Sequence, residues 1–579
     1  MKLLAALFVL GSLALPAHTL DREAFTFTKY DMEVRVEPEQ QRLGVRGKIT
    51  LRNDSQSTQK NLSLQISSTL HWSSIQFGDK PVEFTSQSYN SDIDHTGALS
   101  EAVVTLPRAI APGQTLEFEI GYEGVIPQDT TRLTRIGVPA EVARHSDWDQ
   151  ISPSFTGVRG IGYVAWYPIA TDAANLSEGN SVLETVGRWK QRESQAEVQV
   201  YLCAVRKSSE PVTETSVLHL LMNEPPSRQS RGGGSDGTPC SGHQYRPLGM
   251  IAPLFVISEP STSNQPAVEI HYLAEHKSGA ENYALAVEET APFITKWFGD
   301  FKERPELKAE VIELPDPDAA PFESGNMLLM PLNVKDSALL LSAIQQLTHV
   351  AFPSPRTWIY DGVAHYAQLA FLQERSGRPA VLNYLQSHRE SLLASEKQSA
   401  TEGGNQRTQH SLINSADDFF VQAKAMNAWW MLRDIVGETA LHAALHNYKA
   451  ADDKDAYYVQ QLIEAQAHRD LAWFFDDWVY RDRGLPDFRV VSVYPRQLLG
   501  GGYMVTVTVE NLGDAAAEVP VMLHLEGGEA SARLMVPGKS KASVRIPVAT
   551  MPQEVTVNDG SVPETDTSNN SYKIEASPR

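Results

Sequence analysis

Residues 343–352 read AIQQLTHVAF, and they belong to a segment, 336–352, that is apolar around most of a helical wheel. The polar residues of this segment follow the spacing i, i+3, i+4 and i+7, namely Ser342, Gln345, Gln346 and His349. Side chains at this spacing line one face of a helix, and buried polar groups need hydrogen-bonding partners. The segment therefore predicts a buried helix whose polar stripe faces other polar groups. On its own, the stripe also fits an ordinary histidine that is satisfied in a protein core.

Four other segments surround this helix in a fixed order. They read PDPDAAPFESGNMLLMP (315–331), WIYDGVAHY (358–366), FFVQAKAMNAWWMLRDIVG (419–437) and WVYRDRGLP (478–486). Together with QQLTH they resemble the alanyl aminopeptidase family of zinc peptidases, the gluzincins, over about residues 25–490. FESGNM takes the place of the family's G-A-M-E-N motif. WIYDGVAHY is similar to W-L-x-E-G-F-A-x-Y, and WVYRDRGLP resembles the closing W-x-x-x-x-G-x-P, with five residues in place of four between the tryptophan and the glycine.

The resemblance implies three zinc ligands and one general base. In the family motif H-E-x-x-H, the first zinc ligand falls on Gln345 and the second on His349. The base that activates water falls on Gln346, and the third ligand, a glutamate in the family, falls on Asp361. A glutamine oxygen is a weak, neutral ligand for zinc, and a glutamine cannot take a proton from water. The segment between His349 and Asp361 is also shorter than in the family, so the resemblance predicts a degenerate zinc site.

Two further positions concern the substrate. The glutamate that binds the amino terminus of a substrate falls on Glu323, and the tyrosine that stabilises the oxyanion falls near Gln422. Losing a general base typically slows a reaction by ~10²–10⁴, and losing an oxyanion donor by ~10²–10³. We therefore expect a homologue that has lost zinc-dependent hydrolysis and needs no cofactor. We expect its cleft to bind a peptide or a protein partner, with Glu323 holding the amino terminus.

Two alternatives remain open. Asp361 and His365 are four residues apart and share a helix face, so with His349 they could form an Asp-His-His zinc site. The chain would then be an active metallo-aminopeptidase, with Glu323 as the only obvious base. In the other alternative the chain is purely a binding or structural protein without affinity for peptides.

The hydrophobic period changes twice along the chain. Residues 21–265 contain short alternating segments separated by turn signals, which predict an antiparallel sandwich or saddle, and the resemblance implies a β-saddle. Residues 266–486 follow the helical period, including 357–376, which the resemblance identifies as a thermolysin-like domain. Residues 487–579 alternate again and predict an immunoglobulin-like sandwich. The expected fold class is thus multidomain α+β.

The composition argues against a nucleic-acid partner. The chain has 579 residues and a net charge of −21, with no long basic run. Phosphate binding needs clustered lysine and arginine side chains. An acidic surface of this kind instead favours a soluble protein.

The N-terminus predicts export. Residues 1–17 place Lys2 before an apolar run that is too short to span a bilayer, which is typical of a signal peptide. An uncleaved anchor is the alternative. No later segment is apolar over a membrane-spanning length, so we expect a soluble mature chain in the periplasm or outside the cell. Cys203 and Cys240 could pair in such an oxidising compartment, but the sequence leaves their pairing open.

Overall fold

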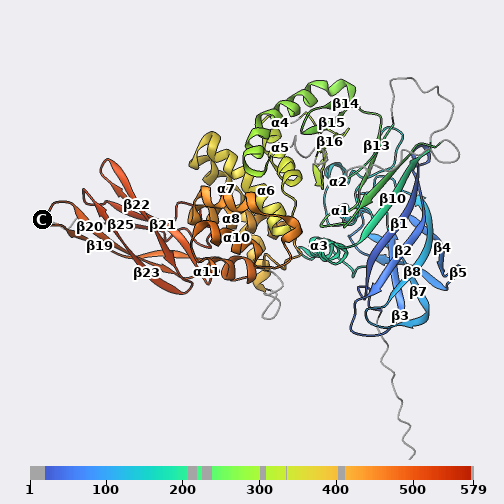
Figure 1. Ribbon diagram of the computed structural model, residues 1–579, viewed down its shortest axis with the longest axis horizontal. Coiled ribbons are helices and arrows are strands. Elements are labelled where there is room, and N and C mark those ends of the chain that lie inside the picture. The colour runs from blue at the N-terminus through green and yellow to red at the C-terminus, as the bar shows by residue number, and fades with distance from the viewer. Residues whose placement is uncertain are drawn as a thin grey trace, which may run out of the picture.

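The computed structural model describes residues 20–205, 218–223, 238–299, 308–333, 336–401 and 411–574. Figure 1 shows a strand-rich N-terminal part, a helical middle part and a C-terminal sandwich at the opposite end of the molecule. The predicted signal peptide, residues 1–17, lies outside the described residues. Within the described residues, no helix has the length and apolar character needed to cross a membrane.

The N-terminal part contains one large and two small sheets. The large sheet has the order β12-β10-β1-β2-β8-β4-β5 and consists of β12 (Cys240–Tyr245), β10 (Glu197–Ala204), β1 (Phe25–Glu37), β2 (Arg42–Asn53), β8 (Thr115–Val125), β4 (Leu70–Phe77) and β5 (Lys80–Pro81). The small sheets are β3 (Gln59–Ser67), β7 (Ala98–Ile110) and β6 (Phe84–Asn90), and β11 (His219–Met222), β13 (Phe255–Ser258) and β9 (Thr156–Val158). The helices here are α1 (Thr131–Arg135), α2 (Ala140–Ser146) and α3 (Ser181–Glu193). In β1, Met32, Val34 and Val36 are buried while the residues between them face outward, as the alternation predicts.

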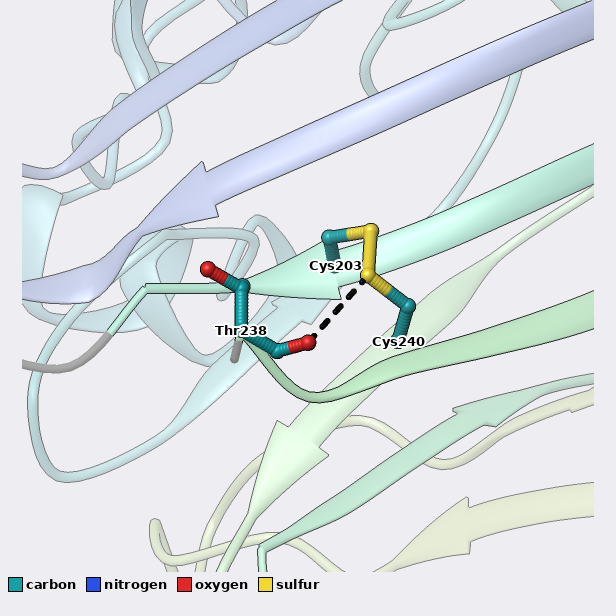
Figure 2. Close-up of a disulfide and its surroundings, with 3 residues drawn as sticks. All are labelled: Cys203, Thr238 and Cys240. Carbon is teal, nitrogen blue, oxygen red and sulfur yellow. Dashed lines mark hydrogen bonds between the residues drawn. A yellow bond between two sulfur atoms is a disulfide. The ribbon is translucent and has the colours of Figure 1, made fainter. Parts of the chain in front are cut away.

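The two cysteines form a disulfide, which answers the question that the sequence left open. Cys203 and Cys240 lie opposite each other in the register of β10 and β12, with Cα atoms 4.1 Å apart. Figure 2 shows the bond, with the carbonyl oxygen of Thr238 lying 3.6 Å from Sγ of Cys240. The bond therefore joins the two ends of the segment between these strands.

The helical part is built around a five-stranded sheet and eight helices of the described residues. The sheet order is β14 (Ser261–Asn264), β15 (Val268–Tyr272), β16 (Ala309–Glu313), β18 (Met327–Met330) and β17 (Phe322–Ser324). The helices are α4 (Lys277–Phe298), α5 (Asp336–Ala351), α6 (Thr357–Ser376), α7 (Arg378–Thr401), α8 (Asp418–Val436), α9 (Glu438–Asn447), α10 (Tyr458–Ala467) and α11 (Ala472–Phe475). The segments 336–352 and 357–376, which the apolar period predicts to be helical, form α5 and α6.

Helices α6 and α8 pack closely because α6 carries a glycine, Gly362, where it contacts α8. A Cβ atom on Gly362 would come within 2.7 Å of the Trp429 ring. The indole of Trp429 donates a hydrogen bond to the carbonyl of Trp358, and both rings are buried. This contact fixes the start of α6, the helix that carries Asp361.

The C-terminal part is a two-sheet sandwich. One sheet has the order β19 (Phe488–Gln497), β20 (Tyr503–Asn511) and β23 (Ser540–Val548), and the other has β22 (Gly528–Val536), β21 (Ala517–Leu525), β24 (Glu554–Val557) and β25 (Ser571–Lys573). It joins the helical part through Trp478, whose indole donates a 2.8 Å hydrogen bond to the carbonyl of Ala516. The amide of Ala516 in turn donates to Asp477 at 2.9 Å. The chain is thus a multidomain α+β protein with several sheets.

Candidate functional site

One residue predicted to bind the substrate and two predicted to be zinc ligands come together from three different elements. Glu323 lies on the edge strand β17, His349 in the last turn of α5, and Asp361 in the first turns of α6. Nδ1 of His349 lies 2.7 Å from Oε1 of Glu323, and Nε2 lies 3.4 Å from Oδ1 of Asp361. The first contact is a hydrogen bond and the second is a longer ion-pair contact. The imidazole is therefore held between two carboxylates.

The three side chains are nearly closed off from solvent. The side chains of Glu323, His349 and Asp361 are 13%, 5% and 15% exposed. The ring of Tyr360 covers His349, with ring centroids 4.1 Å apart and planes 10° from parallel. The sequence motifs did not identify Tyr360 as a site residue, although its position directly before Asp361 could have indicated that it lies at the site. Water therefore screens these charges only weakly.

The charge state of His349 follows from its neighbours. Burial disfavours a charge on the ring, but attraction and hydrogen bonding by Glu323 and Asp361 outweigh it and raise the pKa of His349 to about 10. The ring is therefore an imidazolium at neutral pH, with a proton on both nitrogens. Its Nδ1 donates a hydrogen bond to Glu323, and its Nε2 faces Asp361 at ion-pair distance.

Gln346, at the position of the family's general base, connects the surrounding elements. It is fully buried. Its oxygen accepts a 2.8 Å hydrogen bond from the hydroxyl of Tyr283 on α4, and its nitrogen donates a 2.7 Å bond to the carbonyl of Glu310 on β16. Both ends of the amide are thereby used within the protein, so the amide holds α4, α5 and β16 together and cannot take a proton from water.

Gln368 forms hydrogen bonds with both Gln345 and His365, although the sequence motifs do not single it out. The amide nitrogen of Gln368 donates to the carbonyl of Leu341 at 2.9 Å and to Oε1 of Gln345 at 3.2 Å. Its oxygen is therefore an acceptor, and Nδ1 of His365, 3.1 Å away, must donate to it. Burial lowers the pKa of His365, which favours the neutral ring with an unprotonated Nε2.

Gln422, at the position of the family's oxyanion tyrosine, lies on α8 and is half-buried. A glutamine amide can donate a hydrogen bond, but it has no phenolic proton. The structure thus brings Glu323, His349 and Asp361 into one cluster. It places Gln345 and Gln346 in two separate hydrogen-bonded groups outside that cluster.

A different group of possible metal ligands lies at the border with the N-terminal part. Among the described residues, His145, Asp316 and Asp318 form the one group of three His, Cys, Asp or Glu side chains whose ligand atoms lie within 4.8 Å of one another. Nδ1 of His145 is 2.5 Å from Asp316, and the amide of Ala320 donates to the carbonyl of His145 at 2.7 Å. These contacts already join the end of α2 to the turn that leads into β17.

The residues at the family's zinc position do not fit a zinc ion. Zinc is bound by imidazoles, thiolates and carboxylates, whereas the place of the family's first ligand carries the neutral amide of Gln345 here. The oxygen of Gln345 accepts from Gln368, and the amide of Gln346, bonded to Tyr283, is not a base that could take a proton from a bound water. The donor set therefore argues against the chemistry of a zinc peptidase.

The fold is similar to that of solved aminopeptidases. A solved structure of aminopeptidase A from Legionella pneumophila in complex with aspartic acid matches with a TM-score of 0.59 and 11% identity, over 93% of this chain and 59% of that chain. A mutant of the M1 zinc metallopeptidase from Deinococcus radiodurans, bound to a Tyr-Ser-Ala substrate, matches with a TM-score of 0.46 and 15% identity, over 80% of this chain and 96% of that chain. No protein-family model matches the chain, and no curated protein does. The resemblance in the motifs is thus confirmed at the level of the fold.

Proposed function

We propose that this chain is an aminopeptidase-fold protein that does not hydrolyse peptides and instead binds the amino terminus of a polypeptide. The observation that carries the proposal is the pairing of His349 with Glu323 and Asp361 at the position where the family binds zinc. In this arrangement the imidazole contacts the two carboxylates that a metal would otherwise bind. The retained fold and the changed centre together support binding without cleavage.

Glu323 supports the choice of ligand. Its carboxylate already holds one nitrogen cation, the ring of His349, at 2.7 Å. A peptide α-ammonium carries the same charge and donates hydrogen bonds of the same kind, so it can replace the imidazolium as the partner of Glu323. Binding would then require His349 to turn away. We therefore expect modest affinity, because the peptide must displace an internal partner.

Hydrolysis provides the first test. Purified protein, with and without added zinc, is expected to turn over aminoacyl fluorogenic substrates no faster than the His349→Ala variant, because amides replace the base and one of the three family ligands and a shorter carboxylate replaces another. Elemental analysis is expected to find no stoichiometric zinc. Chelator-sensitive turnover that His349→Ala abolishes would overturn the proposal.

That contrary result would favour the second candidate, a metallopeptidase with rearranged ligands. Its specific support is the unprotonated Nε2 of His365, on the same helix as Asp361 and close to His349. The donor atoms of these three residues do not form a group within 4.8 Å in the described structure, so this candidate requires a rearrangement.

Peptide binding provides the second test. Calorimetry with a panel of short peptides is expected to detect binding only for peptides with a free amino terminus. A charged hydrogen bond is worth ~1.5–3 kcal/mol, so Nα-acetylation of the same peptide is expected to weaken binding roughly 10- to 100-fold. Glu323→Gln is expected to weaken binding of the free peptide by a similar factor and to leave the acetylated peptide unchanged. Equal affinity for both peptides would show that Glu323 is not the recognition site.

We also propose that the protein acts outside the cytoplasm. The disulfide between Cys203 and Cys240 supports this location, because such bonds persist in oxidising compartments. Fractionation of cells that produce the chain, with mass measurement of its N-terminus, tests both the location and the cleavage after Ala17.

A further inference from the structure

The end of the C-terminal sandwich that faces away from the helical part has a distinct surface. The turn 498–502 joins β19 to β20 at this end. The opposite end of β20 is tied to the helical side, since the Asn511 side chain donates to the carbonyl of Ala515 at 2.8 Å, next to the Ala516–Trp478 contact. Figure 1 shows the sandwich extending away from the helices. The turn 498–502 therefore lies at a free end of the molecule.

Two leucines protrude at this turn. Leu499 is fully exposed, and Leu498 is 38% exposed. The backbone closes tightly beneath them, with the amide of Leu498 donating to the carbonyl of Gly502 at 3.0 Å. Gly501 and Gly502 have φ values of 90° and 77°, which side chains rarely adopt. The turn thus forms a narrow apolar point in a defined backbone.

A basic and aromatic surface lies directly behind this point. Arg496 faces outward one row from the end of the sheet, and Tyr494 and Arg545 share a row two positions further in through their common partner Thr506. Tyr494 is 68% exposed, and both arginines are exposed. Neither arginine forms an ion pair with any other residue of the described ranges. In a chain with a net charge of −21, this is a local concentration of unpaired positive charge.

On the same face of the sheet, the charged side chains nearer the helical part form ion pairs with one another. Arg489 and Lys541 both pair with Glu510, at 2.6 Å and 3.7 Å. Four basic residues and one acidic residue thus occupy the outer face of the sheet, and the excess charge lies at the free end. The adjoining hairpin tip of the other sheet carries Glu526 and Glu529, so the basic character belongs to one face and not to the whole end.

We propose that this free end docks on an anionic lipid bilayer. Leu498 and Leu499 enter the boundary between head groups and acyl chains, Arg496 and Arg545 contact lipid phosphates, and Tyr494 lies at the interface. A bilayer is favoured over a protein partner because the apolar part is a single convex point. A stable protein interface needs roughly 800 Å² of matching surface on each partner, which this point does not provide. The sandwich would then hold the peptide-binding centre near a membrane surface.

Sedimentation with lipid vesicles tests this docking on the full chain. The protein is expected to bind vesicles of 70% phosphatidylcholine and 30% phosphatidylglycerol more strongly than vesicles of phosphatidylcholine alone. Leu498→Ser with Leu499→Ser is expected to weaken binding at least tenfold, since each leucine loses its apolar contact. Arg496→Gln and Arg545→Gln are expected to weaken binding to the anionic vesicles about fivefold each and to remove the preference for them.

A matched control lies elsewhere on the chain. Leu285 on α4 is 61% exposed, and Leu285→Ser is expected to bind vesicles like the wild type. Unaltered vesicle binding by the double leucine variant would overturn the proposal and place lipid affinity in another segment, such as the apolar N-terminus. Absence of binding to both kinds of vesicle would also overturn it and leave an acidic protein as the partner to seek. Neither result depends on whether the centre around Glu323 binds peptides, so the two proposals fail separately.

Discussion

At pH 7, His349→Gln is expected to lower the free energy of unfolding of the helical part by about 3–5 kcal/mol, and this loss is expected to shrink as the pH rises. The variant removes the cation between Glu323 and Asp361 and leaves two buried carboxylates without it. Urea unfolding followed by tryptophan fluorescence, with hydrogen exchange of α5 and α6, measures the loss in the part concerned.

The direction of the pH effect follows from the pKa of His349. It rises from an ordinary 6.5 to about 10 in the folded chain, so between these values the folded state holds one more proton than the unfolded state. The stabilisation is complete below pH 6.5 and disappears as the pH rises through 10, at roughly 1.4 kcal/mol per pH unit. The wild type is therefore expected to approach the variant in stability between pH 7 and 10.

An exposed pair of the same chemistry serves as the control. His524 lies 2.8 Å from Glu529, but their side chains are 35% and 63% exposed. His524→Gln is expected to change stability by less than ~1 kcal/mol at every pH, because water screens the pair. A loss in His349→Gln that stays constant from pH 7 to 10 would show that His349 acts through packing and not through its charge.

The sequence predicted which residues form this cluster, but it did not predict the protonation state of His349. The helical period placed α5 and α6, and the order of the motifs placed Glu323, His349 and Asp361 together. Motif spacing, however, does not report protonation. The imidazolium arises because a strand on one side and a helix on the other each bring a carboxylate to the same ring, and such contacts depend on tertiary packing.

Gln346 likewise has a structural role that the local sequence does not predict. The sequence identified Gln346 as a base position that had lost its chemistry. The structure gives it a different task, since its partners Tyr283 and Glu310 lie 63 and 36 residues away along the chain. The pairing of Cys203 with Cys240 stayed open for a similar reason, because it depends on the register of two strands that local patterns do not fix.

Lys424→Met is expected to lower the free energy of unfolding by about 3–5 kcal/mol, comparable with the loss in His349→Gln. Lys424 on α8 is 1% exposed at its side chain and lies 2.7 Å from Glu396 and 3.0 Å from Asp482. Burial opposes its charge, but the two carboxylates outweigh burial and raise its pKa. Methionine fills a similar volume and leaves two buried carboxylates facing each other without a cation.

The loss in Lys424→Met is expected to grow between pH 5 and pH 8, whereas the loss in His349→Gln is expected to shrink between pH 7 and pH 10. Without the lysine, repulsion and burial raise the pKa of one carboxyl group above its unfolded value of ~4, so the variant takes up a proton on folding. The variant then loses stability as the pH rises through that raised pKa, and its deficit is expected to be larger at pH 8 than at pH 5. In His349→Gln the deficit falls over the alkaline range, because there the wild type loses the charge that the variant lacks.

Two variants distinguish this electrostatic cause from a loss of packing. Lys296 pairs with Glu374 on the surface, with side chains 55% and 42% exposed, so Lys296→Met is expected to change stability by less than ~1 kcal/mol. Combining Lys424→Met with Glu396→Gln and Asp482→Asn removes all three charges and is expected to restore most of the loss, since uncharged groups of similar size can replace a buried ion group. If the triple variant unfolds as easily as Lys424→Met alone, the lysine stabilises the fold through its methylene chain and not through its charge.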